Sequence, residues 1–161
     1  MIELNGQLNG TYLWYGAQRQ RGAYRKNQVE QDRNAFKQLG TSGLSSRANV
    51  KSGSAYGNRG RDLVDTLKTN KNILSELKDE HLPEQLQKLP ASKRSQAVLD
   101  MSKKREEIQK EIAKVNRQRE KYISDEKSKQ AKGEAGASTL GDAVQSAIRE
   151  QLHKSGFEFS K

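Results

Sequence analysis

Residue types that carry out metal chemistry are sparse in this chain, and they are not grouped. Histidine occurs only as His81, in KDEHLPE, and as His153, near the end of a predicted helix. There is no cysteine, and no HxxxH or HExxH spacing that would present zinc ligands on one face of a helix. We interpret His81 as a loop residue and His153 as a helix C-terminal residue. We expect no metal site and no cofactor.

The sequence gives little support for acid–base catalysis or for a phosphate-binding loop either. Asp79, Glu80 and Glu84 cluster beside Pro83, but no nucleophile accompanies these carboxylates, so we interpret them as surface residues. The string GNRGRDL, which begins at Gly57, matches neither GxGxxG nor GxxxxGK[ST]. A turn before a capped helix explains it better. The sequence therefore predicts a protein that is not an enzyme.

Charge is the property that suggests a polyanionic partner. The net charge is +10, and it is concentrated in residues 17–61 and 92–132. In the first block, arginines are interleaved with Tyr24 and Tyr56, a combination that can bind single-stranded nucleic acid. No RNP, helix-turn-helix or zinc-finger pattern accompanies it. A basic nucleic-acid-binding helical protein is therefore our alternative, which we do not favour.

Composition favours helices as the elements that position these side chains. Apolar residues make up 32% of the chain and charged residues 31%, too few apolar residues for a large globular core. Long helices with thin apolar stripes suit such a composition, so we expect an all-α fold. No run approaches the roughly 20 apolar residues of a membrane span. The N-terminus has no signal-peptide pattern.

The clearest helical pattern lies in residues 92–130. Positions spaced alternately by 3 and 4 residues form a heptad seam typical of a coiled coil: Val98, Met101, Arg105, Ile108, Ile112, Val115, Arg119 and Tyr122. Residues 139–155 form a second amphipathic pattern. We expect the two helices to pack as an antiparallel hairpin. Short helices from 62–89 should close one end, the first of them capped by Asp62.

Arg105 and Arg119 interrupt the apolar seam. Burying an unpaired charge is costly. We expect their stems to lie along the partner helix with the guanidinium in water, or the charges to pair with an acid such as Asp142 or Glu150. On this interpretation, replacing both arginines by leucine would raise thermal stability.

The N-terminal half is predicted to be irregular. Residues 17–61 carry a weak helical stripe and two Gly/Ser clusters, GTSGLSS and SGSAYGNRG, and suggest a basic, partly disordered connector. Residues 1–16 concentrate aromatic side chains at Tyr12, Trp14 and Tyr15. Such a patch needs a partner surface.

Four strings together resemble a known family. They are LNGQLNGTYLWYG, AYGNRGRDLVD, LKDEHLPEQLQKLPASKRSQAVLDMSKKREEIQKEIAKVNRQREKYI and TLGDAVQSAIREQLHKSGFEF. In this order they resemble the helical region that follows the metal-binding domain in a group of bacterial von Willebrand factor type A proteins. The resemblance makes residues 1–16 the edge of a preceding type A domain or a docking segment. Residues 17–61 are then the connector, and residues 62–161 a helical hairpin module.

The resemblance also implies a function and a compartment. The chain would be a non-enzymatic docking module accessory to a type A domain of the same parent chain, in the cell envelope or secreted. The family's Asp-x-Ser-x-Ser metal motif is absent. The nearest string is DMSKK at Asp100, which has lysine in place of the second serine. Candidate partner-binding residues are Tyr12, Trp14, Tyr15, Ile108, Ile112 and Val115. Packing of the aromatic residues on the chain's own helices is the other interpretation of residues 12–15.

Overall fold

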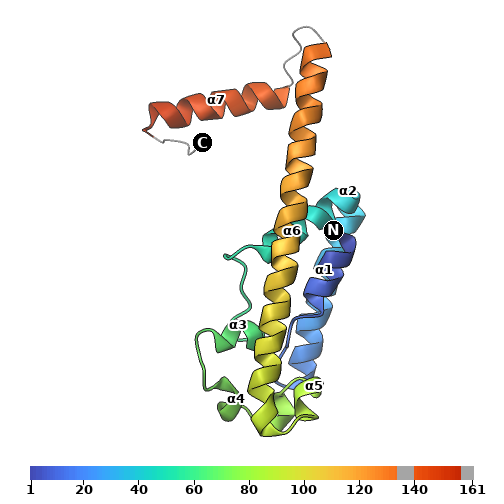
Figure 1. Cartoon of the computed structure of the whole chain (residues 1–161), viewed down its shortest axis with the longest axis vertical. Coiled ribbons are helices and arrows are strands. Elements are labelled where there is room, and N and C mark those ends of the chain that lie inside the picture. Colours follow the sequence, from blue (N-terminus) through green and yellow to red (C-terminus); the bar gives the residue numbers. More distant parts are fainter. Residues whose placement is uncertain (134–139, 157–161) are drawn as a thin grey trace. The chain divides into compact units, whose positions relative to one another are not determined.

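The described part of the chain is helical, as the sequence predicts. A computed structural model describes residues 1–133 and 140–156 (Figure 1). Within these ranges the chain forms seven α-helices, one 3-10 turn and a single isolated bridge between Trp14 and Asp62. The all-α prediction is confirmed.

The elements follow one another with short connections and form two compact units. Unit 1 is Met1–Gln118 and unit 2 is Arg119–Lys161. The helices are α1 (Ile2–Asn9), α2 (Gln18–Ser52), α3 (Leu63–Leu67), α4 (Ile73–Glu76), η1 (Asp79–His81), α5 (Glu84–Gln87), α6 (Ala91–Gly133) and α7 (Leu140–Lys154).

Helix α2 occupies most of the segment that was expected to be a partly disordered connector. The cluster GTSGLSS, expected to be a loop, lies inside the helix, where only Gly40 departs from helical geometry, with φ 60°. Gly40 divides α2 into two arms. The second arm folds back on the first, because Arg47 and Lys51 both pair with Asp32. The two arms meet so closely that a Cβ atom built on Gly43 would lie 2.3 Å from the carbonyl oxygen of Ala35.

One hydrophobic cluster of unit 1 gathers the short helices. Asp62 caps α3 by accepting a hydrogen bond from the amide of Asp65, as expected. The apolar residues of α3, α4 and α5 then pack on the first third of α6. The buried members of the cluster are Leu13, Leu63, Val64, Ile73, Leu82, Leu86 and Val98.

The second cluster covers the middle of the α6 seam. Its buried members are Leu8, Tyr12, Ala48, Ile108 and Ile112. The heptad pattern therefore identified buried positions, but the partner differs from the expected one. These seam positions are buried by residues from α1, from the segment after it and from α2. Their leucine and aromatic side chains take the place of the second amphipathic helix that was expected.

Helices α6 and α7 begin and end close to the predicted residues. On α7, Val144 and Ile148 are exposed. Gly156 follows α7 with φ 82°, the left-handed conformation typical of a helix C-cap. None of the described helices is both long and apolar enough to span a membrane.

Candidate functional site

The aromatic residues of the N-terminal segment form a ladder inside unit 1. Tyr12 stacks on Trp14 with 4.9 Å between ring centroids, and Tyr24 lies 6.0 Å beyond Trp14 at a tilt of 50°. A guanidinium group lies over the aromatic ring at each end of this ladder. Arg105 lies 4.5 Å from the Tyr12 centroid and Arg61 lies 5.3 Å from that of Tyr24. The ring faces are thus largely used within the chain, by aromatic and cation–π contacts.

Main-chain hydrogen bonds hold the aromatic segment in place. The amide of Leu13 donates to the Asp62 carboxylate at 2.6 Å, and the amide of Leu63 donates to the Leu13 carbonyl at 3.0 Å. The amide of Tyr15 donates to the carbonyl of Arg61 at 2.9 Å. Residues 12–15 therefore pack on the chain's own elements, the second of the two interpretations.

Arg105 anchors the same segment from α6. Its side chain is 3% exposed and donates to Asp62 at 2.7 Å and to Asp65 at 3.1 Å. It also donates to the Thr11 carbonyl at 2.7 Å and to the Thr11 hydroxyl at 3.0 Å. The expectation of a water-exposed guanidinium or a pair with the final helix is therefore wrong for Arg105. Acids and a threonine in unit 1 satisfy it, and burial of Asp62 requires a cation at this place.

Two acids of α7, Asp142 and Glu150, were proposed as seam partners for Arg105 and Arg119. Glu150 pairs with Lys154 at 2.7 Å, one turn further along α7. The side chain of Asp142 lies outside the described residues. Arg119 is half-buried.

A second buried polar network joins α1 to both arms of α2. Asn5 and Asn9 donate to Asp32 at 2.9 and 2.6 Å, and each accepts from Lys51 at 2.6 Å. Lys51 also pairs with Asp32 at 3.0 Å and is 1% exposed. The four-residue spacing of Asn5 and Asn9 places both amides on one face of α1. The repeated LN of LNGQLNG is thereby explained.

Burial and pairing shift the acidities in this network. Burial lowers the pKa of Lys51 to about 8, although the neighbouring Asp32 charge opposes the shift. Burial alone would raise the pKa of Asp32, but hydrogen bonds from Asn9 and Asn5 and the charge of Lys51 lower it overall. At Tyr12, burial raises the pKa of the phenol.

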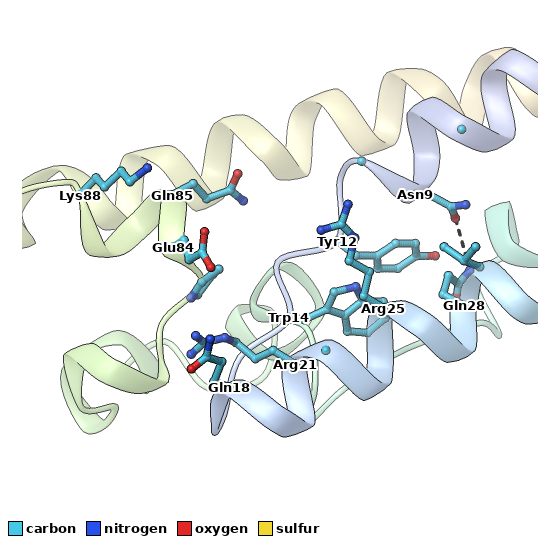
Figure 2. A pocket seen from close by; sticks show the side chains of 15 residues that line it. Asn9, Tyr12, Trp14, Gln18, Arg21, Arg25, Gln28, Glu84, Gln85 and Lys88 are labelled. Carbon is cyan, nitrogen blue, oxygen red and sulfur yellow. Dashed lines mark hydrogen bonds between the residues drawn. The ribbon is translucent and has the colours of Figure 1, made fainter.

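An open groove of about 1090 Å³ lies beside Trp14 (Figure 2). We call it the Trp14 groove. One wall is α2 between residues 18 and 29, and the other is residues 83–88. The lining is completed by Tyr12, Trp14, residues 6 and 9 of α1, and residue 10 directly after it. Figure 2 shows Arg21 and Arg25 on α2, beside Trp14, and Glu84, Gln85 and Lys88 on the opposite wall.

The Trp14 groove carries an excess of positive charge. Arg21, Arg25 and Lys88 line it, against one acid, Glu84. Arg21 donates to the carbonyls of Gly16 at 2.9 Å and Glu80 at 2.6 Å. Among the described residues, none of the three cations forms an ion pair. Their charge is therefore available to a ligand.

The candidate partner-binding residues divide into buried and half-buried side chains. Tyr12, Ile108 and Ile112 are buried in the second cluster, so they are corrected here to core residues. Trp14, Tyr15 and Val115 are half-buried. Of the six, only Tyr12 and Trp14 line the groove. The structure does not bring the six together as one surface.

Sequence reasoning placed Arg21 and Arg25 in a basic block but did not predict the groove, and it missed the buried pair of Asp32 and Lys51. Arg21 and Arg25 are spaced by four residues, the spacing of one helix face, and this signal was hidden because no helix was expected around them. Lys88 comes from a distant segment and offers no such signal. Asp79, interpreted as surface, is exposed and pairs with Arg94 at 2.6 Å, which lowers the pKa of its carboxyl.

Neither similarity to known proteins nor a metal-ligand group in the described residues indicates a function. Comparisons with protein-family models, curated proteins and solved structures found no match. Within residues 1–133 and 140–156, no three His, Cys, Asp or Glu side chains are grouped so as to hold a metal ion. The surfaces of unit 1 and α7 are therefore the features that can indicate a function.

Proposed function

We propose that this chain is a non-enzymatic helical docking module that serves as the C-terminal accessory region of a von Willebrand factor type A protein. Its partner is the type A domain of the same parent chain. One observation carries the proposal: apolar side chains are exposed on α2 beside the beginning of α1. Phe36 is 47% exposed and Leu39 is 71% exposed.

The pairing of α1 with α2 places this apolar pair near the point where a preceding domain would join. Asn5 bonds to Asp32 and Asn9 bonds to Gln28, so the two helices run antiparallel. Continuing this register by one turn brings Met1 level with Phe36. A type A domain that ends in LNGQLNGTYLWYG, as the resemblance implies, would therefore stand beside Phe36 and Leu39.

The anchoring of residues 1–16 supports the proposal. Leu8 is fully buried and Leu13 is 1% exposed, so the segment belongs to the core of unit 1. A domain whose last residues are this segment would be held close to unit 1. Short connections of this kind raise the effective concentration of one surface at the other.

The aromatic contacts favour a protein partner over single-stranded nucleic acid. Base stacking needs a free ring face. Tyr12 and Trp14 stack on each other, and Tyr24 is covered by Arg61. Tyr56 donates its hydroxyl to Gln28 at 3.1 Å and packs against the second cluster.

Binding to an isolated type A domain tests the proposal. The type A domain of the parent chain is titrated into the 161-residue chain by isothermal titration calorimetry. We expect binding that is lost in Phe36→Ser/Leu39→Ser. The matched control, Val144→Ser/Ile148→Ser, removes two exposed apolar side chains from α7 and should bind like the unchanged chain.

Two results would contradict the proposal. One is no binding of the type A domain by the unchanged chain. The other is an equal loss of binding in both double variants. A mobility-shift series with single-stranded DNA at two salt concentrations examines the rival function, whose binding should weaken steeply with salt.

A further inference from the structure

The Trp14 groove is distinct from the Phe36 and Leu39 pair, and it has the features of a ligand site. It combines cations, half-buried aromatic surface and exposed amide side chains in one open hollow of unit 1. No element described above uses the three cations in an ion pair. The groove is therefore a second candidate binding site of unit 1.

We infer that the Trp14 groove binds a short acidic peptide segment of a protein partner. Arg21, Arg25 and Lys88 outnumber Glu84, so the lining has a net charge of +2. A ligand with carboxylate side chains complements this charge. Arg21 already uses one guanidinium nitrogen for the carbonyl oxygens of Gly16 and Glu80, which fixes the orientation of its side chain.

The lining also suits the main chain and apolar side chains of a peptide. A Cβ atom added at Gly6 or Gly22 would meet nothing within 4 Å, so a peptide backbone can approach both positions. Val29, which is 44% exposed, continues the groove with apolar surface. The exposed amides of Gln18 and Gln85 can donate to and accept from main-chain groups.

A nucleic acid is less well matched to the same surface. Trp14 stacks on Tyr12 across an interplanar angle of 13°, and its other ring neighbour is Tyr24. An intercalating base would have to displace one of these rings. Carboxylates need only the cations at the rim. Oligonucleotide binding is therefore an outcome of the test and not part of the inference.

The experiment uses the 161-residue chain and two synthetic probes. One is a short fluorescein-labelled peptide of alternating glutamate and leucine, and its neutral match alternates glutamine and leucine. Binding is followed by fluorescence anisotropy, and by the emission of Trp14, the only tryptophan of the chain. We expect the acidic peptide to bind and to change the Trp14 emission, and the neutral peptide to do neither.

Charge variants locate the binding. Arg21→Gln/Arg25→Gln/Lys88→Gln should weaken binding of the acidic peptide by about tenfold or more, since several exposed ion pairs are lost together. Arg59→Gln/Lys68→Gln/Lys104→Gln removes the same charge from exposed residues outside the groove and should bind normally. Because Arg21 has structural hydrogen bonds, Arg25→Gln/Lys88→Gln serves as a second variant that leaves them in place.

Several results would overturn the inference. These are no binding of the acidic peptide, equal binding of the neutral peptide, or equal losses in the groove and control variants. Tight binding of a single-stranded oligonucleotide without binding of the acidic peptide would assign the groove to nucleic acid. Loss of type A domain binding in Phe36→Ser/Leu39→Ser is a separate readout, so the two proposals fail independently.

Discussion

Arg105 connects α6 to the N-terminal segment through a buried cation. It satisfies the carboxylate of Asp62, which is fully buried, and the main chain at Thr11. A buried ion pair of this kind adds little over an apolar pair of the same shape, but removing one partner leaves the other charge without compensation. The residue therefore specifies how the segments meet.

Replacing Arg105 should destabilise unit 1, contrary to what its seam position suggests. In Arg105→Met, Asp62 stays buried without its cation, so the free energy of unfolding should fall by about 3–5 kcal/mol. Urea unfolding followed by circular dichroism measures the change. Lys104→Met, on the exposed side of α6, should stay within about 0.5 kcal/mol. Equal stability of Arg105→Met and the unchanged chain would mean that the polar partners of Arg105 do not contribute to stability.

Lys51 should make stability depend on pH above neutrality. Its pKa is about 8 when folded, below its ordinary value of 10.5, so the folded chain loses the proton first. Between these values the unfolded chain binds more protons, and the contribution of Lys51 to the free energy of unfolding rises with pH, by at most about 1.4 kcal/mol per unit. Asp32, whose pKa is lowered, stays ionised over this window, and Arg47 is the other charged group that faces Lys51 in the network.

The comparison with Lys51→Met isolates this effect. The free energy of unfolding of the unchanged chain minus that of Lys51→Met should increase from about pH 7.5 to about pH 9.5. Other titrating groups, Tyr12 among them, cancel in the difference. A difference that stays constant or decreases over this range would mean that Lys51 keeps an ordinary pKa.

Sequence reasoning reached some of these residues and missed others. Asp62 was expected as a helix cap, because the cap signal lies within four residues of chain. Its second role, as the partner of Arg105, depends on a contact across 43 residues. The Asp32–Lys51 pair spans 19 residues and two helical arms. Charge pairs at such separations have no periodic signal in one sequence.

At the scale of elements, α2 shows why a Gly/Ser cluster need not be a loop. Gly40 supplies the one non-helical conformation, and Gly43 lets the second arm approach the first. The long helix α6 and the final helix α7 were predictable, since their apolar periodicity is local. The covering of the α6 seam was not, because the residues that cover it belong to an irregular aromatic segment and to α2.

Gly43 should not tolerate even a methyl group. A Cβ atom there would lie 2.3 Å from the carbonyl oxygen of Ala35 and 2.7 Å from the Cβ of Leu39. Gly43→Ala should therefore lower the free energy of unfolding by about 1–3 kcal/mol. Gly22→Ala is the matched control in the first arm, where the space is open, and should raise it by about 0.5–1 kcal/mol. Thermal melts that rank the two variants in the opposite order would refute the close contact between the arms.

At the scale of the whole molecule, three stretches far apart in sequence close unit 1. The N-terminal segment, the two arms of α2 and the first two-thirds of α6 each contribute buried side chains. Figure 1 shows α1 and α2 beside this part of α6. Hydrogen bonds from Arg105 to Thr11 bridge 94 residues. Removing the N-terminal segment would expose both hydrophobic clusters, because Leu13 belongs to the first and Leu8 and Tyr12 belong to the second. Partner surfaces are therefore expected at exposed side chains, at Phe36 and Leu39 and in the Trp14 groove.

Amide hydrogen exchange of residues 11–16 tests most directly whether the aromatic segment is part of unit 1 or a free edge that awaits a partner. The amides of Leu13 and Tyr15 donate to Asp62 and Arg61, so we expect them to exchange as slowly as those of Ile108 and Ile112 in α6. The exposed residues 54 and 55 should exchange rapidly by comparison. Exchange of Leu13 and Tyr15 at the rate of an unstructured peptide would contradict this account, because the aromatic segment would then be unattached to unit 1.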